Sequence, residues 1–348
     1  MQHARENRLL VFQVHGYARR RQMEGSEAEV QHVVAAVIVN GSHQILLARR
    51  PLDRHQGGLW EFPGGKVECG EAPRLALARE LHEELGIVVR EARPLIKVRH
   101  AYPDKSVLLD VWRVDAFSGE PHGREGQPID WVSPRDLPSR DFPAANRPVV
   151  TAARLPSVYL ITPEPGDTAV FLNRLESLLV AGVSLVQLRA KTLEPAAYAG
   201  LARQVLSLCA SAGARLLLNA PPALAEELGA QGVHLSSAGL MALNERPLGP
   251  EQWVAASCHS REELDHACRI GVDFVVLAPV SATASHPGAR SLGWQNLRRL
   301  CEQSTVPVYG LGGMALKDLA MAWEHGCQGI ASISALWTAE EPPHDLCL

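Results

Sequence analysis

The sequence lacks the features that mark secreted, membrane-spanning and zinc-stabilised proteins. Its seven cysteines form no CxxC pair and no zinc-type spacing, which argues against a disulfide framework and a structural zinc site. No run of 18 apolar residues occurs, and the first 22 residues have neither the apolar core nor the small-residue cleavage site of a signal peptide. We therefore expect a cytoplasmic protein whose thiols are reduced.

An excess of positive charge is also missing. The formal net charge is -4, and lysine and arginine are dispersed apart from the cluster at Arg19, Arg20 and Arg21. This balance argues against a nucleic-acid polymer or a membrane as partner, so any nucleotide bound is expected to be small. With 348 residues, of which 46% are hydrophobic and 21% charged, the chain can bury a substantial core and is long enough for two domains.

The first domain is predicted over residues 31–155, after an N-terminal extension at 1–30 that we expect to be mobile, with Met23 a candidate start of the folded protein. Short apolar strands flank Asn40 and Gly41, a dipeptide typical of hairpins. Pro73 and Gly86 bracket a helix, and further strands are expected over 107–117 and 129–133.

A change of pattern after Pro156 predicts a second domain over residues 157–340. Eight short apolar runs, from VYLIT to GIASIS, alternate there with helical segments such as REELDHACRIG. Buried strands that alternate with helices are typical of parallel βαβ units, and eight such units favour an α/β parallel (βα)8 TIM barrel over an open sheet. Only the residues LPS separate the two domains, so we expect the halves to abut.

The segment RELHEELG at residues 79–86 crowds three acidic side chains onto one helix. Like charges three and four residues apart destabilise an isolated helix, so a partner outside the helix is expected. At 100° per residue we expect Leu77, Ala78, Leu81 and Leu85 to dock on one arc, and Glu80, Glu83 and Glu84 to face outward on the opposite arc. The alternative interpretation is a solvated charged face.

The stretch from Gly65 to Ile87 carries every fixed position of the Nudix box, and residues 32–155 resemble the MutT-type 8-oxo-dGTP diphosphatases in LLARR, LWEFPGGKVE, EGQP and DFPAAN. The resemblance implies an α+β fold, a mixed sheet with flanking helices. It also implies hydrolysis of 8-oxo-dGTP to the monophosphate and pyrophosphate, which removes oxidised nucleotides before replication. Hard divalent cations prefer such oxygen ligands, and the cofactor is expected to be Mg²⁺, with Mn²⁺ as the alternative. The implied metal ligands are Gly64, Glu80, Glu83 and Glu84, with Glu125 as a further acidic catalytic residue.

Base recognition is assigned by the same resemblance. The residues implied are Arg50, His55, Glu61, Phe62, Pro63, Gly64 and Asn146. An amide such as that of Asn146 offers a donor and an acceptor side by side and can read a purine edge, although the same residue could instead cap a helix. A guanidinium cannot act as a base at neutral pH, so Arg79 is interpreted as a brace for Glu71.

The second domain resembles the thiamine-phosphate synthase and thiazole tautomerase superfamily over residues 157–338. The ligand-binding positions implied by this resemblance are Gln187, Arg189, Lys191, Asn219, Ser257, Thr283, Ser285, Gly312, Gly313, Ser332 and Ile333, the last four forming a phosphate cradle. The expected ligand is a thiazole phosphate.

Departures from the synthase pattern put condensation to thiamine phosphate in doubt. The two metal-binding acids of the synthases are replaced by Ala220 and by the acid-free stretch VHLSSAGL, and a lysine is replaced by His286. His259 is a candidate proton shuttle for a metal-free tautomerase, or else a histidine at a helix start without a chemical role. Cys258 is interpreted as a small buried hydrophobe, with a reactive thiol as the alternative. The alternatives are a non-catalytic, ligand-binding barrel beside a generic Nudix pyrophosphohydrolase, and an active synthase or tautomerase.

Overall fold

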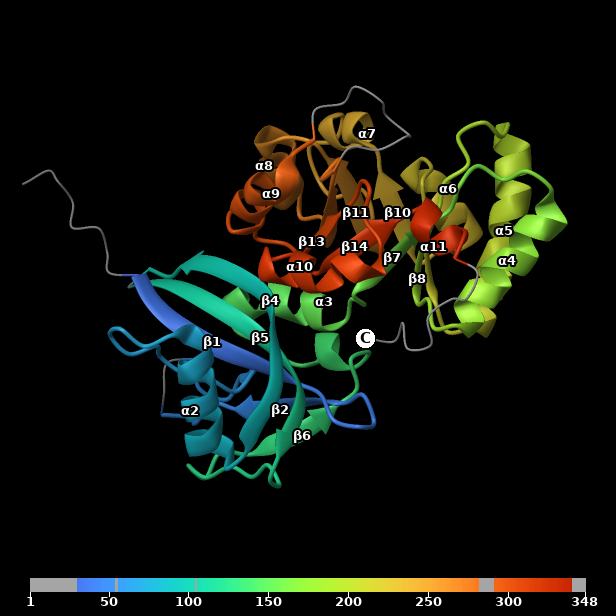
Figure 1. The fold of residues 1–348 in the computed structure, drawn as a ribbon. Coiled ribbons are helices and arrows are strands. Elements are labelled where there is room, and N and C mark those ends of the chain that lie inside the picture. The colour runs from blue at the N-terminus through green and yellow to red at the C-terminus, as the bar shows by residue number, and fades with distance from the viewer. Residues whose placement is uncertain (1–29, 54–55, 104, 282–290, 340–348) are drawn as a thin grey trace, which may run out of the picture.

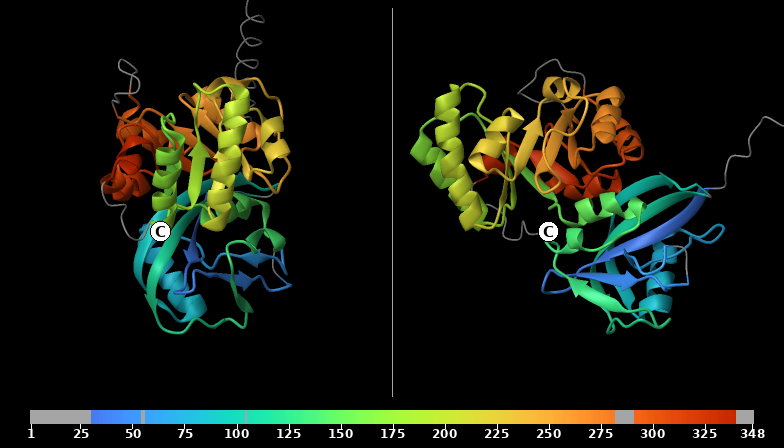
Figure 2. Two further views of the ribbon diagram at one scale, coloured as in Figure 1. Left: turned by 90° about the vertical axis from the view of Figure 1, so that its right-hand side faces the viewer. Right: turned by 180° about the vertical axis from the view of Figure 1, so that it is seen from behind.

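The computed structural model describes residues 30–53, 56–103, 105–281 and 291–339. They form two domains joined by a short connection, with the hydrolase-like half below the barrel in Figure 1 and in both views of Figure 2. The N-terminal extension and the positions His55, Thr283, Ser285 and His286 lie outside the described residues. No helix in the described ranges is long and apolar enough to cross a membrane.

The first domain contains two three-stranded sheets and the predicted helix. One sheet has the order β1(Val30–Ile38), β5(Ser106–Ser118), β4(Val88–Ala101), and the other β3(Trp60–Glu61), β2(Ile45–Arg49), β6(Ile129–Val132). β1 is parallel to β5, while β4 is antiparallel to it, so the sheet is mixed as expected. Helix α2(Pro73–Leu85) packs against β1 and β4.

The predicted turn at Asn40 and Gly41 is present between β1 and β2, but the two strands do not form the extended hairpin that was expected. Only one bridge, between Val39 and Ile45, joins the two strands before they part into different sheets. The outer edge of β1 is occupied instead by the glycine loop, because the Val34 and Ala36 N–H groups donate to the carbonyls of Gly65 and Pro63.

The sequence pattern also missed β4, which follows α2 and forms an edge of its sheet. Charged residues interrupt its alternation, and Pro94 lies within it. Proline lacks an N–H group, so it is tolerated where one side of a strand has no neighbour. The ladder with β5 shifts register around this region, between Pro94 and Ile96 among other places.

All eight predicted barrel strands are present, and they close in the order β7-β8-β9-β10-β11-β12-β13-β14 with every pair parallel. Their bounds are β7(Val158–Ile161), β8(Leu185–Leu188), β9(Arg215–Leu218), β10(Gly232–Leu235), β11(Trp253–Cys258), β12(Phe274–Leu277), β13(Val308–Gly310) and β14(Gly329–Ser332). The helices between them are α4(Thr168–Val180), α5(Pro195–Ser211), α6(Pro222–Leu228), α7(Ser237–Met241), α8(Arg261–Ile270), α9(Gly293–Cys301), α10(Leu319–Glu324) and α11(Ser334–Trp337).

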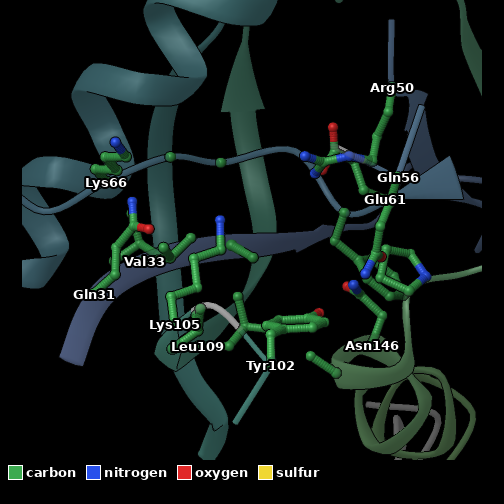
Figure 3. A pocket seen from close by; sticks show the side chains of 18 residues that line it. Gln31, Val33, Arg50, Gln56, Glu61, Lys66, Tyr102, Lys105, Leu109 and Asn146 are labelled. Carbon is green, nitrogen blue, oxygen red and sulfur yellow. The ribbon is translucent and has the colours of Figure 1, made fainter. Parts of the chain in front are cut away.

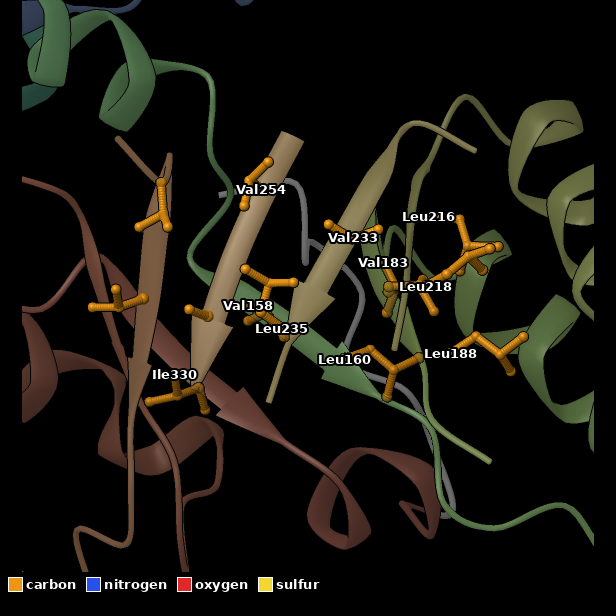
Figure 4. Packing of buried hydrophobic residues seen from close by; sticks show 14 of the residues in the cluster. Val158, Leu160, Val183, Leu188, Leu216, Leu218, Val233, Leu235, Val254 and Ile330 are labelled. Atoms are coloured by element: carbon orange, nitrogen blue, oxygen red, sulfur yellow. The ribbon is translucent and has the colours of Figure 1, made fainter. Parts of the chain in front are cut away.

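Two apolar layers hold the barrel together. Side chains such as Val158, Leu160 and Val233 point outward against the helices, as Figure 4 shows. The barrel interior is filled by Tyr159, Phe274 and their neighbours, and most of these strand residues are fully buried. Uninterrupted apolar runs are expected when both faces of a strand are covered.

The two domains do abut, as the short connection predicted. Helix α3(Arg147–Ala153) leads into Leu155, which is 4% exposed and belongs to the apolar cluster inside the barrel. Across the same junction the Arg93 guanidinium lies 4.2 Å from the Trp323 ring centroid and donates to Ser157 Oγ at 3.2 Å. The contacts gather at the N-terminal ends of the strands, so the opposite, C-terminal end of the barrel stays open for a ligand.

Candidate functional site

Helix α2 carries the acidic residues of the first candidate site. It begins with Pro73 and ends at Gly86, whose φ of 73° lies in the left-handed region that glycine adopts without strain. The buried side chains are those of Ala76, Leu77, Leu81 and Leu85, whereas Ala78 is only partly buried. The prediction of Ala78 on the docked arc is therefore wrong.

The acidic residues do not all face outward, which corrects a second expectation. The Glu83 side chain is 56% exposed, but that of Glu80 is 15% exposed and Glu84 is partly buried. The reason is helical spacing, because Glu80 and Glu84 each lie three or four residues from Leu77 or Leu81 and so flank the apolar stripe. Their carboxylates face the glycine loop.

The loop glycines allow this approach. A Cβ on Gly65 would lie 2.2 Å from the Glu80 carboxyl carbon, and a Cβ on Gly64 would lie 2.1 Å from the Val34 carbonyl oxygen. Gly64 has a φ of 151°, and its N–H donates to Glu84 Oε2 at 3.1 Å. Only glycine therefore lets the loop pass between β1 and the carboxylates of α2.

Burial raises the pKa of Glu84 to about 8. The Gly64 N–H opposes this shift, while the negative charges of Glu61, Glu80 and Glu125 add to it. A group of carboxylates that raise one another's proton affinity is stabilised by a cation placed between them. The site therefore has the charge distribution that a divalent metal ion requires.

Arg79 acts as the predicted brace. Its Nε and Nη2 donate to the two Glu71 carboxylate oxygens at 3.0 and 2.9 Å, and Nη2 also donates to the Lys66 carbonyl. Nη1 donates to Glu80 and Glu83 at 2.9 and 3.2 Å. The guanidinium therefore ties the glycine loop to the helix and offsets part of the acidic crowding.

The donor set fits a hard divalent cation. Carboxylate oxygens are offered by Glu80, Glu83 and Glu84. A backbone carbonyl is offered by Gly64, which lies in sequence between Pro63 and Gly65, the two loop residues whose carbonyls accept hydrogen bonds from β1. No three histidine, cysteine, aspartate or glutamate side chains within the described ranges already form a metal-holding group. Arg79 donates hydrogen bonds to Glu80 and Glu83.

Beside the carboxylates lies a cavity of about 300 Å³. Its lining includes the predicted residues Arg50, Glu61, Phe62, Gly64 and Asn146. In Figure 3, Arg50, Glu61 and Asn146 lie on one side, and Gln31, Lys66 and Lys105 on the other. Arg50 forms an ion pair with Glu61, whose pKa is nevertheless raised by burial. Pro63 is buried behind the cavity, where its carbonyl accepts from Ala36 N–H.

The Asn146 side chain lines the cavity and forms no capping bond. It precedes α3 directly, yet the start of that helix has no side-chain cap. The residue is 9% exposed and lines the cavity. Buried amides need hydrogen-bonding partners, and a ligand edge would supply them.

Sequence reasoning missed five polar residues of this cavity, which are Gln31, Gln56, Lys66, Tyr102 and Lys105. Lys66 follows the Gly-Gly pair directly and could have been found from that position. Tyr102 and Lys105 belong to the connection between β4 and β5, and the failure to predict β4 hid them.

The barrel holds a larger cavity of about 910 Å³ at the C-terminal ends of its strands. The predicted residues that line it are Gln187, Arg189, Lys191, Asn219, Ser257, His259, Gly312, Gly313, Ser332 and Ile333. Lys317 and Glu164, which the sequence did not single out, also line it. With Arg189 and Lys191, Lys317 gives the cavity a surplus of positive charge, which suits an anionic ligand.

Glu164 organises the basic edge of this cavity. Its carboxylate accepts from Arg189 Nη1 at 3.3 Å, from Lys191 N at 3.1 Å and from Thr192 Oγ1 at 3.0 Å. These bonds outweigh partial burial and lower the pKa of Glu164. The loop after β7 is thereby joined to the loop after β8, with the arginine held in place.

A glycine pair lines the part of the cavity near β13. Gly312 and Gly313 have φ values of 111° and 65°, and a Cβ on Gly312 would lie 2.9 Å from Pro279. Nearby, Ser332 is 3% exposed and donates through Oγ to the Met314 carbonyl. Such a turn can expose backbone N–H groups to an anion.

His259 and Cys258 differ sharply in environment. His259 Nδ1 donates to the Ala278 carbonyl at 2.7 Å, which leaves Nε2 as the nitrogen available to the cavity. Burial raises the pKa of the Cys258 thiol to about 12, which agrees with the interpretation as a buried hydrophobe.

The fold and the two cavities define a two-domain protein, an α+β domain with an acidic helix beside a cavity, joined to a (βα)8 barrel with a cavity at the C-terminal ends of its strands. The profile described as "NUDIX domain" matches residues 34–152, and that described as "Thiamine monophosphate synthase" matches residues 158–336. The chain belongs to the Nudix hydrolases of the MutT type in its first half and to the thiamine-phosphate synthase family in its second. It is therefore an enzyme, a hydrolase of a family that generally uses divalent metal ions.

Individual relatives match each half separately. The 8-oxo-dGTP diphosphatase of Escherichia coli strain K12 is 42% identical over 118 residues, 34% of this chain and 92% of that protein. The thiamine-phosphate synthase of Thermus thermophilus is 35% identical over 192 residues, 53% of this chain and 89% of that protein. A solved MutT structure, from work on Aliivibrio salmonicida and Vibrio cholerae, has 42% identity and a TM-score of 0.33, covering 36% of this chain and 98% of its own.

Proposed function

We propose that the first domain hydrolyses oxidised purine nucleoside triphosphates, 8-oxo-dGTP in particular, to the monophosphate and pyrophosphate. The observation that carries the proposal is the carboxylate group of α2, which lies beside a cavity lined by Arg50, Glu61 and Asn146. The E. coli relative, described as an 8-oxo-dGTP diphosphatase, supports the same substrate. Removal of such nucleotides would protect replication from mispairing.

In this proposal Glu80, Glu83, Glu84 and the Gly64 carbonyl hold Mg²⁺, with Mn²⁺ as a substitute, and Glu125 adds negative charge nearby. When bound, the metal supplies Lewis-acid stabilisation of the phosphate oxygens and activation of water. Arg79 keeps the loop and helix together, and Lys66 and Lys105 lie on the cavity wall where an anionic phosphate chain would be neutralised.

The base is proposed to lie against Asn146. The amide can donate to one edge atom and accept from another, so it can distinguish purines that differ in the protonation of one ring nitrogen. Arg50, paired with Glu61, would contact the same ligand, while Phe62 gives the cavity an apolar wall. His55 is proposed as a further contact on the strength of the family resemblance alone.

A substrate panel separates this function from that of a generic Nudix pyrophosphohydrolase. The full chain with Mg²⁺ is incubated with 8-oxo-dGTP, dGTP, ADP-ribose and a dinucleoside polyphosphate, and the products are identified chromatographically, with a chelator as control. We expect 8-oxo-dGTP to be cleaved most efficiently, to a monophosphate and pyrophosphate. Preferential cleavage of ADP-ribose or the dinucleotide would contradict the base assignment.

For the barrel we propose binding of a thiazole phosphate without pyrophosphate chemistry. Arg189, Lys191, Lys317 and the Gly312–Gly313 turn suit a phosphate, and by the family resemblance Ala220 replaces a metal-binding acid of the synthases. Calorimetry on the full chain should detect the ligand with an affinity that a chelator does not change. Formation of thiamine phosphate at an ordinary enzymatic rate would contradict this proposal.

His259 is proposed as the proton shuttle of a thiazole tautomerase, because its Nε2 is available to the cavity while Nδ1 is held by Ala278. Proton exchange at the thiazole ring, followed by NMR, should occur with the wild type and stop in His259→Ala. Exchange in neither protein would instead support a ligand-binding barrel without catalysis.

A further inference from the structure

Three hydrogen-bonded polar side chains, two of them buried, connect the interior of the barrel with the wall of its cavity. Tyr159 Oη lies 3.0 Å from His234 Nδ1, and His234 Nε2 lies 2.8 Å from Ser257 Oγ. Tyr159 is 0% exposed and His234 is 1% exposed, whereas Ser257 lines the cavity. The chain therefore connects a site that a ligand cannot reach with one that it can.

The direction of the hydrogen bonds follows from counting protons. A neutral imidazole has one N–H donor and one acceptor nitrogen, so His234 can donate to only one of its two neighbours. If it donated to Tyr159, the phenol proton would need another acceptor, and no second partner of Tyr159 Oη occurs among the described residues. A buried hydroxyl proton without an acceptor is strongly disfavoured.

The opposite direction satisfies every group. Tyr159 donates to Nδ1, Nε2–H donates to Ser257 Oγ, and the serine proton is left to point into the cavity. A charged His234 would donate in both directions, but burial lowers the pKa of His234 to about 3, so the ring is neutral at physiological pH. The surroundings are apolar, since Phe274 and Tyr309 pack against Tyr159.

We propose that Tyr159 and His234 are positioning residues that fix the Ser257 hydroxyl as a hydrogen-bond donor to the barrel ligand. The freed Ser257 proton then favours a ligand that presents an acceptor at this wall, such as a ring nitrogen or an oxygen, while the second lone pair of Oγ remains as an acceptor. The same arrangement excludes Ser257 as a nucleophile activated by His234, because the imidazole has no free lone pair facing the serine. The inference rests on the proposed ligand class of the barrel.

The direct test is the tautomer of His234 in the full chain, with no ligand added. In ¹⁵N-labelled protein at neutral pH, two-bond proton–nitrogen correlations should show His234 protonated at Nε2, with the signals assigned by their loss in His234→Gln. Protonation at Nδ1, or a charged ring, would overturn the proposal. In Tyr159→Phe the fixed direction should be lost, so that the Nδ1-protonated form becomes detectable.

A binding cycle tests the consequence for the ligand, with a thiazole phosphate as the probe and inorganic phosphate as a second probe. Tyr159→Phe should weaken binding of the thiazole phosphate by about three- to tenfold, the range for one hydrogen bond, and leave inorganic phosphate binding unchanged. The matched control is Tyr309→Phe, which removes another buried hydroxyl of the same cluster that donates to the Pro156 carbonyl. This control should bind as the wild type does.

Combining substitutions shows whether Tyr159 acts through Ser257. The loss in Tyr159→Phe should not add to that in Ser257→Ala, because both remove the same donor. Additive losses would contradict the proposal. If the wild type fails to bind the thiazole phosphate while His234 shows the Nε2 tautomer, the proposed ligand is wrong but the direction of the hydrogen bonds from Tyr159 to Ser257 stands.

Discussion

Glu84→Gln is expected to raise the stability of the metal-free protein and to lower the catalytic rate. In the metal-free protein burial raises the pKa of Glu84 to about 8, from 4.5 in an exposed chain. The folded state therefore binds this proton more tightly than the unfolded state, and the associated stability is present below about pH 4.5 and is lost as the pH rises toward 8. Glutamine keeps the shape of the side chain and removes the titration.

The magnitude follows from the width of this window. Each pKa unit corresponds to about 1.4 kcal/mol, so at pH 7 the shift of Glu84 sets an upper bound of roughly 3.4 kcal/mol. Because the residue is only partly buried, solvent screening reduces this to about 2 kcal/mol. Metal-free Glu84→Gln should thus be about 2 kcal/mol more stable than the wild type at pH 7 and nearly equal to it at pH 4.5.

Urea unfolding with chelator at pH 4.5, 6 and 7 measures this difference, with Glu83→Gln as the matched control because the Glu83 side chain is 56% exposed. Excess Mg²⁺ should reverse the order, since the wild type alone keeps the full ligand set. The kcat of Glu84→Gln should fall at least about a hundredfold, which corresponds to roughly 3 kcal/mol. A fully active variant, one that does not fold, or one with no pH-dependent gain would refute the reasoning.

Three further substitutions test other parts of the account. Asn146→Ala should reduce the ratio of kcat/KM for 8-oxo-dGTP over dGTP while phosphate chemistry persists, whereas equal losses on both substrates would indicate a structural role. Gly65→Ala should displace the Glu80 carboxylate, whose carbon would lie 2.2 Å from the new Cβ, and lower kcat at least about tenfold. Gly41→Ala, which meets nothing within 4 Å, is its control and should keep wild-type activity. Leu155→Ala should lower the free energy of unfolding of the barrel by about 2–4 kcal/mol in urea titrations, and an unchanged midpoint would show that Leu155 is not part of the barrel core.

The barrel could be predicted from sequence because each of its strands is a short apolar run bounded by turns. Burial on both faces removes polar alternation, so a run such as FVVL has no competing interpretation as a surface element. Helix α2 was equally predictable, since Pro73 and Gly86 mark its ends. In contrast, β4 was not predicted, because charged residues and Pro94 interrupt its apolar pattern. A proline is tolerated in β4 because this strand lies at the edge of its sheet.

The sequence identified the residues of the two sites more accurately than it predicted their burial and hydrogen bonds. The Nudix pattern identified Glu84, but its burial depends on the glycine loop that occupies the edge of β1, and this pairing is not local in sequence. The same limit applies to Glu164, whose bonds to Arg189 and Lys191 form only when the loops after two neighbouring strands meet. Contacts of this kind follow from tertiary structure.

The central claim is that the first domain selects an oxidised purine nucleotide, and a competition experiment tests it most directly. Equal concentrations of 8-oxo-dGTP and dGTP are incubated in one vessel with the full chain and Mg²⁺, and both are followed by chromatography until half of the total is consumed. Because the starting concentrations are equal, the ratio of the two initial consumption rates gives the ratio of kcat/KM directly. We predict that 8-oxo-dGTP is consumed first while dGTP is largely retained, and consumption of both at the same rate, or of dGTP first, would contradict the claim.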